Sequence, residues 1–248
     1  SERQKNIFVK NIIKVANSSQ LPKNVRIVSQ FIEKYFNNVT FGDVSQSSPE
    51  ELFGLVHAHW KFASKREHGK ALVRTYNPTL KKDGWNCKHT VIEITNEDMP
   101  FLLDSITLEL NRLGLNPHLT LHPVVNVLRS KAGKMEGIYP ISNMSHIAVC
   151  ESFIHMQISK QPDQQLAKIS EAIYKVVRDV RYVVEDWSKM RAIMSSIMQE
   201  LGSKPRGVGT EDIAEAREFL RWVHDDHFTF LGYREYDFKG KGKNFSAT

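Results

Sequence analysis

The stretch from His89 to Arg129 most constrains the fold, because its hydrophobic pattern changes period twice. Residues 90–95 (TVIEIT) alternate and are mostly β-branched, which is typical of a strand. Residues 102–113 place leucine and isoleucine at spacings of three and four, which predicts an amphipathic helix that stops at Gly114. Alternation then returns over residues 119–129. The stretch therefore predicts a strand–helix–strand crossover.

The turn between the first strand and the helix, Asn96–Pro100, is the point of the chain where polar and acidic side chains most suggest a binding site. Asp98 is a suitable N-cap residue, and Pro100 fits the first helical turn, where its missing N–H costs nothing. The unpaired N–H groups of a helix N-terminus also favour a carboxylate. Two interpretations stay open: Asp98 caps its own helix and the turn binds nothing, or the turn binds a small molecule. Glu97 and Asp98 point apart on a turn, which argues against a shared acid–base site.

The remaining patterns extend this crossover to a ferredoxin-like order. Ser48, Pro49 and Glu51 predict a capping box at the start of a third N-terminal helix. Helices are predicted over 4–16, 24–36, 49–63 and from Asp163, strands over 70–76 and 149–159, and irregular chain over 134–147. We therefore expect an α+β fold: a ferredoxin-like antiparallel sheet with helices on one face, plus N-terminal helices and a C-terminal helical extension.

The C-terminal part reads as helices followed by one strand. Asp186 can cap a second helix after a kink, and the Met-rich stretch that follows is either packed core or a partner groove. The aromatic alternation of 228–238 predicts a strand that either completes the sheet late or begins a second module. We expect three parts: an N-terminal helical segment (1–66), the sheet domain (67–185) and the helical extension (186–248).

Composition is that of a soluble globular protein, with 41% hydrophobic and 25% charged residues in 248. The net charge of +6 is spread along the chain, so neither a nucleic-acid nor a membrane partner is expected. No apolar run approaches the length of a membrane span, and the N-terminus has no secretory core. Cys87 and Cys150 form no CxxC pair, which favours free thiols in a reducing compartment. A cytoplasmic location is therefore expected.

Catalytic and metal motifs are missing from the sequence: there is no GxGxxG, HExxH, GxSxG or P-loop. His118 and His122 would lie about 13 Å apart on a strand, so they cannot share a metal. His57 and His59 face different ways on a helix. Residues 225–227 (DDH) resemble an acid or metal cluster, but such residues are more often caps and turn formers. We expect no catalytic and no metal-binding residue.

Four segments resemble the N-terminal region of the large bacterial NAD-specific glutamate dehydrogenases: YNPTLKKDGWNCKHTVIEITNEDMPFLLDSITLELNRLGL, ESFIHMQI, VEDW and DDHFTFLGYREYD. The resemblance spans about Glu51 to Phe238. It implies an ACT-like domain, a βαββαβ module that commonly binds amino acids and pairs with another copy. In that family this region is regulatory or architectural, and the NAD-binding domain lies further downstream. No cofactor is therefore expected in this segment, with NAD in a parent that oxidises glutamate to 2-oxoglutarate.

ACT domains bind effectors at the loop between the first strand and the first helix. The resemblance therefore implies an amino-acid effector site made of Asn96, Glu97, Asp98, Met99, Pro100 and Phe101. ACT loops usually have a glycine after the proline, and this chain has Phe101, which favours a structural ACT fold without a ligand. Three hypotheses follow: an amino-acid sensor, an assembly module that contacts other domains of the parent or forms a homo-oligomer, and an independent enzyme acting through Asp226 and His227.

Overall fold

The computed structural model describes residues 2–19, 25–37, 39–45, 47–139, 148–203, 207, 209–236, 238–241 and 244–247. Contacts divide the chain into two compact units, Ser1–Val180 and Arg181–Thr248. Among the described residues, no helix has the length and apolar character needed to cross a membrane.

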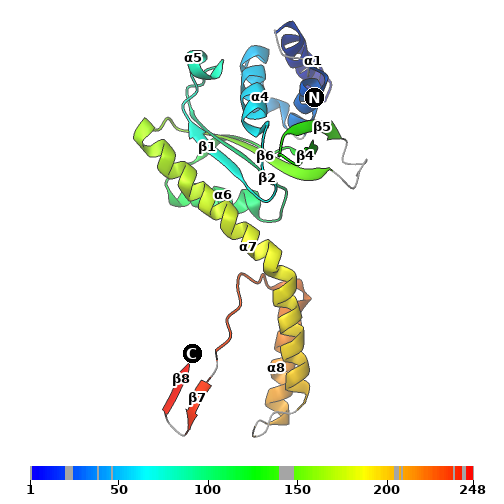
Figure 1. The fold of residues 1–248 in the computed structure, drawn as a ribbon, viewed down its shortest axis with the longest axis vertical. Coiled ribbons are helices and arrows are strands. Elements are labelled where there is room, and N and C mark those ends of the chain that lie inside the picture. The colour runs from blue at the N-terminus through cyan, green and yellow to red at the C-terminus, as the bar shows by residue number, and fades with distance from the viewer. Residues whose placement is uncertain are drawn as a thin grey trace. The chain divides into compact units, whose positions relative to one another are not determined.

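The first unit is built on an antiparallel sheet (Figure 1). Neighbouring strands lie in the order β1 (Leu72–Tyr76), β2 (Thr90–Glu97), β6 (Val149–Ile158), β4 (Val124–Arg129) and β5 (Met135–Tyr139). The remaining strand, β3 (Pro117–Leu121), also pairs with β6. β6 is therefore central: β2 lies along one side, and β3 and β4 share the other.

The predicted crossover is present. α6 (Leu102–Arg112) joins β2 to β3, and both strands pair antiparallel with β6 between them. The stretch predicted as one strand over 119–129 is two strands, which separate at His122 and Pro123. Pro123 has no N–H to give to the ladder, although its carbonyl accepts from the N–H of Phe153 at 2.9 Å. The break therefore lets the chain follow both halves of β6.

The edge of the sheet beside β2 is occupied by β1, which comes earlier in the chain. A ferredoxin-like order would place there a strand that follows the second helix. The prediction of a strand over 228–238 is wrong: residues 228–236 are neither helix nor strand, and β7 begins at Phe238. Many residues of this segment are apolar and favour a strand, but a strand also needs a neighbour to pair with. The position beside β2 is already occupied by β1.

One face of the sheet packs on α6 and on the first part of α7 (Asp163–Gly202). Ile92 and Ile94 of β2 point to this face, as the alternation predicts. Its buried apolar members are Ile92, Ile94, Leu102, Ile106, Leu110, Ile154, Met156, Ile158, Ile169, Ile173 and Val177.

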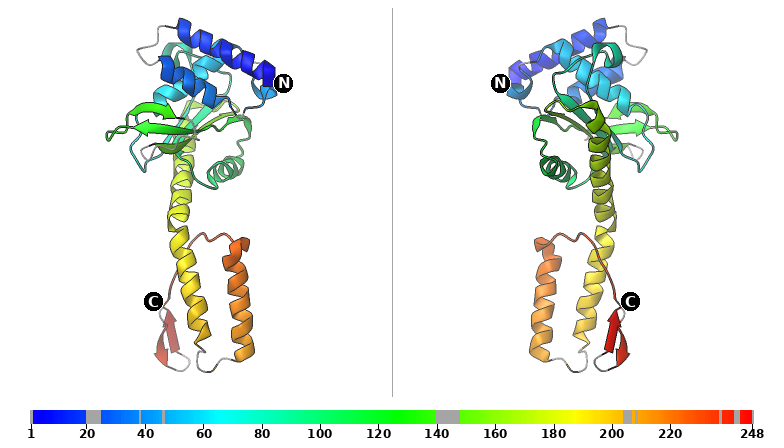
Figure 2. Two further views of the ribbon diagram at one scale, coloured as in Figure 1. Left: turned by 90° about the vertical axis from the view of Figure 1, so that its right-hand side faces the viewer. Right: turned by 90° about the vertical axis from the view of Figure 1, so that its left-hand side faces the viewer.

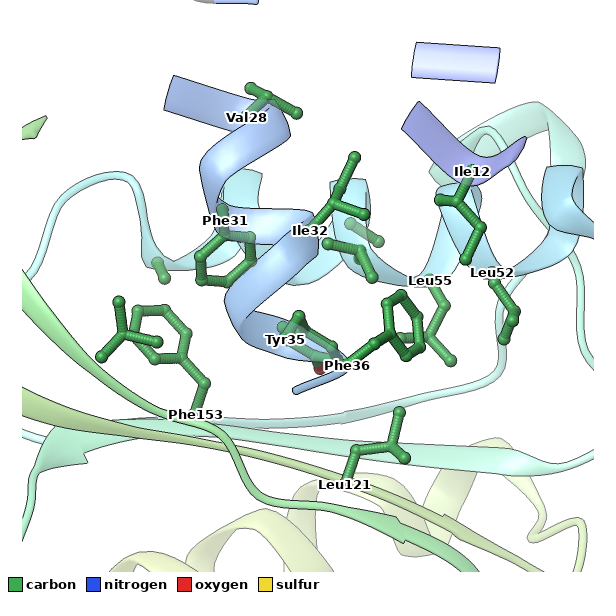
Figure 3. Close-up of a cluster of buried hydrophobic side chains, with 14 of the residues drawn as sticks. Ile12, Val28, Phe31, Ile32, Tyr35, Phe36, Leu52, Leu55, Leu121 and Phe153 are labelled. Atoms are coloured by element: carbon green, nitrogen blue, oxygen red, sulfur yellow. The ribbon is translucent and has the colours of Figure 1, made fainter. Parts of the chain in front are cut away.

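The other face packs on the N-terminal helices α1 (Glu2–Ser18), α2 (Val25–Tyr35), α3 (Phe41–Val44) and α4 (Pro49–Ala63). Figure 2 shows the sheet edge-on, with these helices on one side and α6 on the other. Phe31 of α2 meets Phe153 of β6 edge-to-face at 4.9 Å between ring centroids (Figure 3). The expectation of helices on one face was therefore incomplete, because the N-terminal helices cover the second face.

Two local predictions in the first unit have opposite outcomes. The capping box of α4 is confirmed, with Ser48 and Glu51 each bonded to the other's backbone N–H. Residues 134–147 were predicted as irregular, but Met135–Tyr139 forms β5 against β4, and residues 140–147 lie outside the described part. The short helix α5 (Leu80–Asp83) lies between β1 and β2.

The second unit contains the rest of α7, then α8 (Thr210–Trp222), the π-turn η1 (Val223–His227) and the strands β7 (Phe238–Lys241) and β8 (Asn244–Ala247). α7 is continuous from Asp163 to Gly202, so Asp186 does not cap a second helix. Among the described residues of this unit, the buried apolar side chains are Met190, Ile213 and Val223. The Met-rich stretch thus contributes one buried residue, and the described part of this unit has few buried apolar side chains.

Candidate functional site

The predicted effector turn lies where β2 ends and α6 begins, at one end of the sheet. Asn96 is buried, and its Nδ2 donates to the carbonyl of Glu97 at 2.8 Å. Met99 is half-buried and packs against the core under α6, whereas Asp98 and Pro100 are exposed. These four of the six predicted residues therefore form one turn at the end of the sheet. Two of them are buried or half-buried, and the other two are exposed.

Asp98 does not cap α6, which corrects the local prediction. Its carboxylate accepts from Ser152 Oγ at 2.5 Å, and its backbone N–H donates to the carbonyl of Cys150 at 2.9 Å. His122 Nε2 lies 2.9 Å from the same Ser152 oxygen. Asp98 thus forms hydrogen bonds with β6 instead of with the N-terminus of α6, and these bonds fix the position of its carboxylate.

His122 and Ser152 were not predicted as part of this site. They come from the break between β3 and β4 and from β6, so only the folded sheet brings them to the turn. Burial lowers the pKa of His122, and the carboxylate of Asp98 partly offsets this. Burial is also the main cause of the raised pKa of Cys150, with Asp98 and Glu151 adding to it.

Phe101 stands at the N-cap position of α6 with a left-handed backbone, φ 66°. This region suits glycine, and a phenylalanine there is strained. The backbone therefore keeps the conformation that a glycine after the proline would adopt. Because Phe101 gives no side-chain cap, the positive end of the helix dipole can attract an anion. Phe101 itself is 50% exposed.

Glu97 links the turn to a buried network of charges. Its Oε1 accepts from the N–H of Gly69 at 3.0 Å and lies 3.6 Å from Arg66. Arg66 in turn reaches Glu151 at 2.7 Å, and Arg129 binds both oxygens of Glu151 at 2.6 and 2.8 Å. Glu151 is fully buried, so two arginines compensate one desolvated carboxylate, and Glu97 balances the second positive charge.

A second buried polar cluster lies between α4 and the sheet. His59 of α4 has its Nδ1 at 2.7 Å from the hydroxyl of Tyr35 and its Nε2 at 3.2 Å from Thr95 Oγ1. Glu93 of β2 accepts from Arg74 Nε at 2.7 Å and from Tyr76 at 2.9 Å. These bonds join α2, α4, β1 and β2, and no local pattern in the sequence indicated them.

The charge states of this cluster follow from burial and neighbours. Burial lowers the pKa of His59 to about 4, although Glu93 acts in the opposite direction, so its imidazole is neutral at pH 7. Burial alone would raise the pKa of Glu93, but His59, His155 and Arg74 lower it to about 2. Burial and the charge of Glu93 raise the pKa of Tyr76. A neutral histidine thus lies beside a carboxylate that stays ionised.

This cluster also has the geometry of a possible metal site, which the sequence did not predict. His59, Glu93 and His155 each offer one ligand atom, and these atoms lie within 4.8 Å of one another. However, both nitrogens of His59 and both oxygens of Glu93 already have protein partners, and the cation of Arg74 binds the same carboxylate. We therefore interpret the cluster as a hydrogen-bond network that fixes α4 to the sheet.

The acidic cluster of residues 225–227 has a structural arrangement. Asp226 has a left-handed backbone, φ 61°, and accepts from Arg191 of α7 at 3.0 Å. Arg191 also donates to the carbonyl of His224 at 3.0 Å, and His227 stacks on Trp222. These contacts hold the turn after α8, as expected for caps and turn formers.

The chain matches the family described as "Glutamate dehydrogenase, ACT1 domain" over residues 31–173. It is similar to the NAD-specific glutamate dehydrogenases of Pseudomonas aeruginosa (32% identical over 210 residues, 84% of this chain) and Halomonas elongata (32% over 212 residues, 85% of this chain). The enzyme of the same description from Mycobacterium tuberculosis is 29% identical over 182 residues, 73% of this chain and 11% of that protein. The chain covers 13% of the length of each of the first two relatives.

Proposed function

The chain belongs to the glutamate dehydrogenase ACT1 domain family, and on that premise we propose that it is a non-catalytic N-terminal regulatory module of an NAD-dependent glutamate dehydrogenase. The parent would oxidatively deaminate glutamate to 2-oxoglutarate in the cytoplasm, with NAD bound outside this segment. The description of the relatives as NAD-specific glutamate dehydrogenases supports this proposal. The chain covers 13% of the length of the first two relatives, so most of such a parent would lie outside this segment.

The proposed fold of the module is ACT-like, that is, ferredoxin-like. The order β2, α6, β3–β4, β6, α7 supports it, with β1 taking the edge position. We retain the division into 1–66, 67–185 and 186–248 as the proposed domain organisation. The proposed partners are the remaining domains of the parent and a second copy of the module in a homo-oligomer.

The observation that carries the regulatory proposal is the pairing of opposite charges at the turn. The N-terminus of α6 has no side-chain cap, so its first N–H groups attract a carboxylate. Asp98 lies in the same turn, and Ser152 and the carbonyl of Cys150 hold it in place. An α-amino acid has an ammonium beside its carboxylate, and it would satisfy both ends of this turn. A carboxylate fixed before binding loses little entropy when the ligand arrives.

Calorimetric titration of the chain with each of the twenty amino acids, at millimolar concentration, tests this proposal. We expect heat with at least one of them, and loss of that heat in Asp98→Asn, which removes the charge and keeps the size. Glu136→Gln is the matched control, because Glu136 is an exposed acidic residue on β5. If none of the twenty produces heat, or if both variants bind equally, the turn is not the effector site.

The alternative is a structural or oligomerisation ACT-like domain that binds no small molecule. Phe101 favours it, since a phenylalanine at the N-cap position of α6 leaves less room for a ligand's carboxylate than a glycine would. Leu108, on α6, is 71% exposed and would suit a contact with another protein surface. Sedimentation of the parent with and without this segment tests the alternative: a smaller assembly after deletion, together with an unchanged response to amino acids, would establish it.

A further inference from the structure

Residues 228–236 (FTFLGYREY) have the composition of a strand but form none. Four of its nine residues are aromatic, and aromatic residues favour strands. Within the described part of the chain, the segment pairs with no strand. All nine residues are exposed except Phe230, which is half-buried.

The apolar side chains of this segment are unusually open to water. Phe228 is 59% exposed and Leu231 is 73% exposed, and Tyr233 and Tyr236 are exposed as well. Soluble proteins rarely leave several large apolar side chains uncovered on one short segment unless another surface covers them. An unpaired, apolar, β-favouring backbone is also the kind of segment that adds to the edge of another sheet.

The strands that follow give an independent indication. Among the described residues, β7 and β8 pair with each other and with no further strand, from Phe238 opposite Ala247 to Lys241 opposite Asn244. A sheet of two strands has marginal stability in water without further strands or a packed face. The described residues between 228 and 247 therefore contain β-forming backbone without a sheet of three or more strands.

In the sheet of the first unit, the position beside β2 is occupied by β1. The chain covers only 13% of the length of its relatives, so a parent of that size has many further residues to offer. We propose that residues 228–236 pair as a strand with the edge of a sheet formed by a part of the parent polypeptide outside this chain. This inference relies on the proposed function only for the identity of the parent.

The start of the segment is held in a fixed direction. Arg191 binds Asp226 and the carbonyl of His224, and His227 stacks on Trp222 at 5.2 Å between ring centroids. The left-handed backbone of Asp226 ends the helix and turns the chain. Residue 228 therefore follows a turn that is held by several contacts. Because the start of the segment is already ordered, less conformational entropy is lost when the segment pairs.

Hydrogen exchange of the backbone amides tests the proposal in the full-length parent and in the present chain. We expect amides of 228–236 to exchange fast in the chain alone and at least about 100-fold more slowly in the parent, as for amides in a stable strand. Leu231→Pro, which removes a donor and cannot sit in a central strand, should abolish the slowing across the segment in the parent. Leu231→Thr, which keeps the N–H and introduces a β-branched side chain that favours strands, should preserve it.

Three results would overturn the proposal. Fast exchange of 228–236 in the parent would show that nothing pairs with the segment. Slow exchange in the chain alone that grows with protein concentration would identify a second copy as the occupant, and slow exchange at every concentration would identify pairing within the chain. The readout does not depend on amino-acid binding at Asp98, so the proposed function can fail while this inference stands, and the reverse.

Discussion

Protonation of His59 should destabilise the first unit in mild acid. The side chain of His59 is fully buried between α4 and the sheet, and both ring nitrogens have partners. Burial lowers its pKa from 6.5 to about 4, so the unfolded chain binds a proton more readily than the folded one between these values. The stability from this group is thus complete above pH 6.5 and is lost as the pH falls toward 4.

The size of the effect follows from the two pKa values. At pH 5 the unfolded histidine is mostly protonated and the folded one mostly neutral, which costs about 2 kcal/mol relative to pH 7.5, rising to about 3 kcal/mol at pH 4. Glu93 has a pKa lowered from 4.5 to about 2, so its own contribution is lost only below pH 4.5. A comparison of pH 7.5 with pH 5 therefore isolates His59 from Glu93.

Urea unfolding at pH 7.5 and pH 5, followed by circular dichroism, measures this loss. In His59→Gln, which cannot titrate, the loss on acidification should be smaller than in the unaltered chain by about 2 kcal/mol. His68→Gln is the control, because His68 is 85% exposed, and it should leave the loss unchanged. Tyr35→Phe removes one partner of His59 but keeps the imidazole, so it should also retain the loss.

The reasoning is refuted if His59→Gln and the unaltered chain lose equal stability between pH 7.5 and pH 5. Should the variant be too unstable to measure, titration of the His59 ring by NMR in the unaltered chain decides the same question. A ring that becomes protonated near pH 6.5 in the folded protein would contradict the buried neutral state.

Three further predictions concern the turn, the charged network and the core. Phe101→Gly should unfold with a free energy higher than that of Phe101→Ala by about 1 kcal/mol, since both remove the ring but only glycine accepts φ 66° freely; equal stabilities by urea unfolding would show that the residue is unstrained. Glu151→Gln should cost about 3–5 kcal/mol in the same assay, because it leaves two buried guanidinium groups without their shared carboxylate, and a cost below about 1 kcal/mol would refute the network. Ile106→Ala should cost about 2–5 kcal/mol by thermal or urea unfolding, whereas Leu108→Ala, two residues along α6 and 71% exposed, should stay within about 0.5 kcal/mol.

Sequence patterns were sufficient for the α+β architecture and the central crossover. The alternation in β2 and the three-and-four spacing in α6 depend only on which residues face a core, so both appear in one local stretch. The edge position of β1 was not predictable in the same way. Its choice depends on pairing with β2 rather than on its own residues, and 228–236 had an equally good strand pattern.

The charged residue Glu93 of β2 explains why the sequence did not predict that helices cover both faces of the sheet. A charged residue such as Glu93 that alternates with apolar residues in a strand predicts that its face of the strand is exposed to solvent. Here it is buried, because Arg74, 19 residues away in the sequence, and Tyr76 satisfy it from β1. Asp98 shows the same limit, since local rules made it a helix cap, while its actual partner, Ser152, lies 54 residues further along the chain.

The pairing of β1 beside β2, at the edge of the sheet, has a consequence for folding during synthesis on the ribosome. Every strand of the first sheet lies between Leu72 and Ile158, so no later residue is needed to close it. Domains generally fold as units, and N-terminal ones fold first during synthesis. The sheet can thus be complete, with its N-terminal helices in place, before the residues that follow β6 have been made. Those later residues would then fold against a surface that is already ordered.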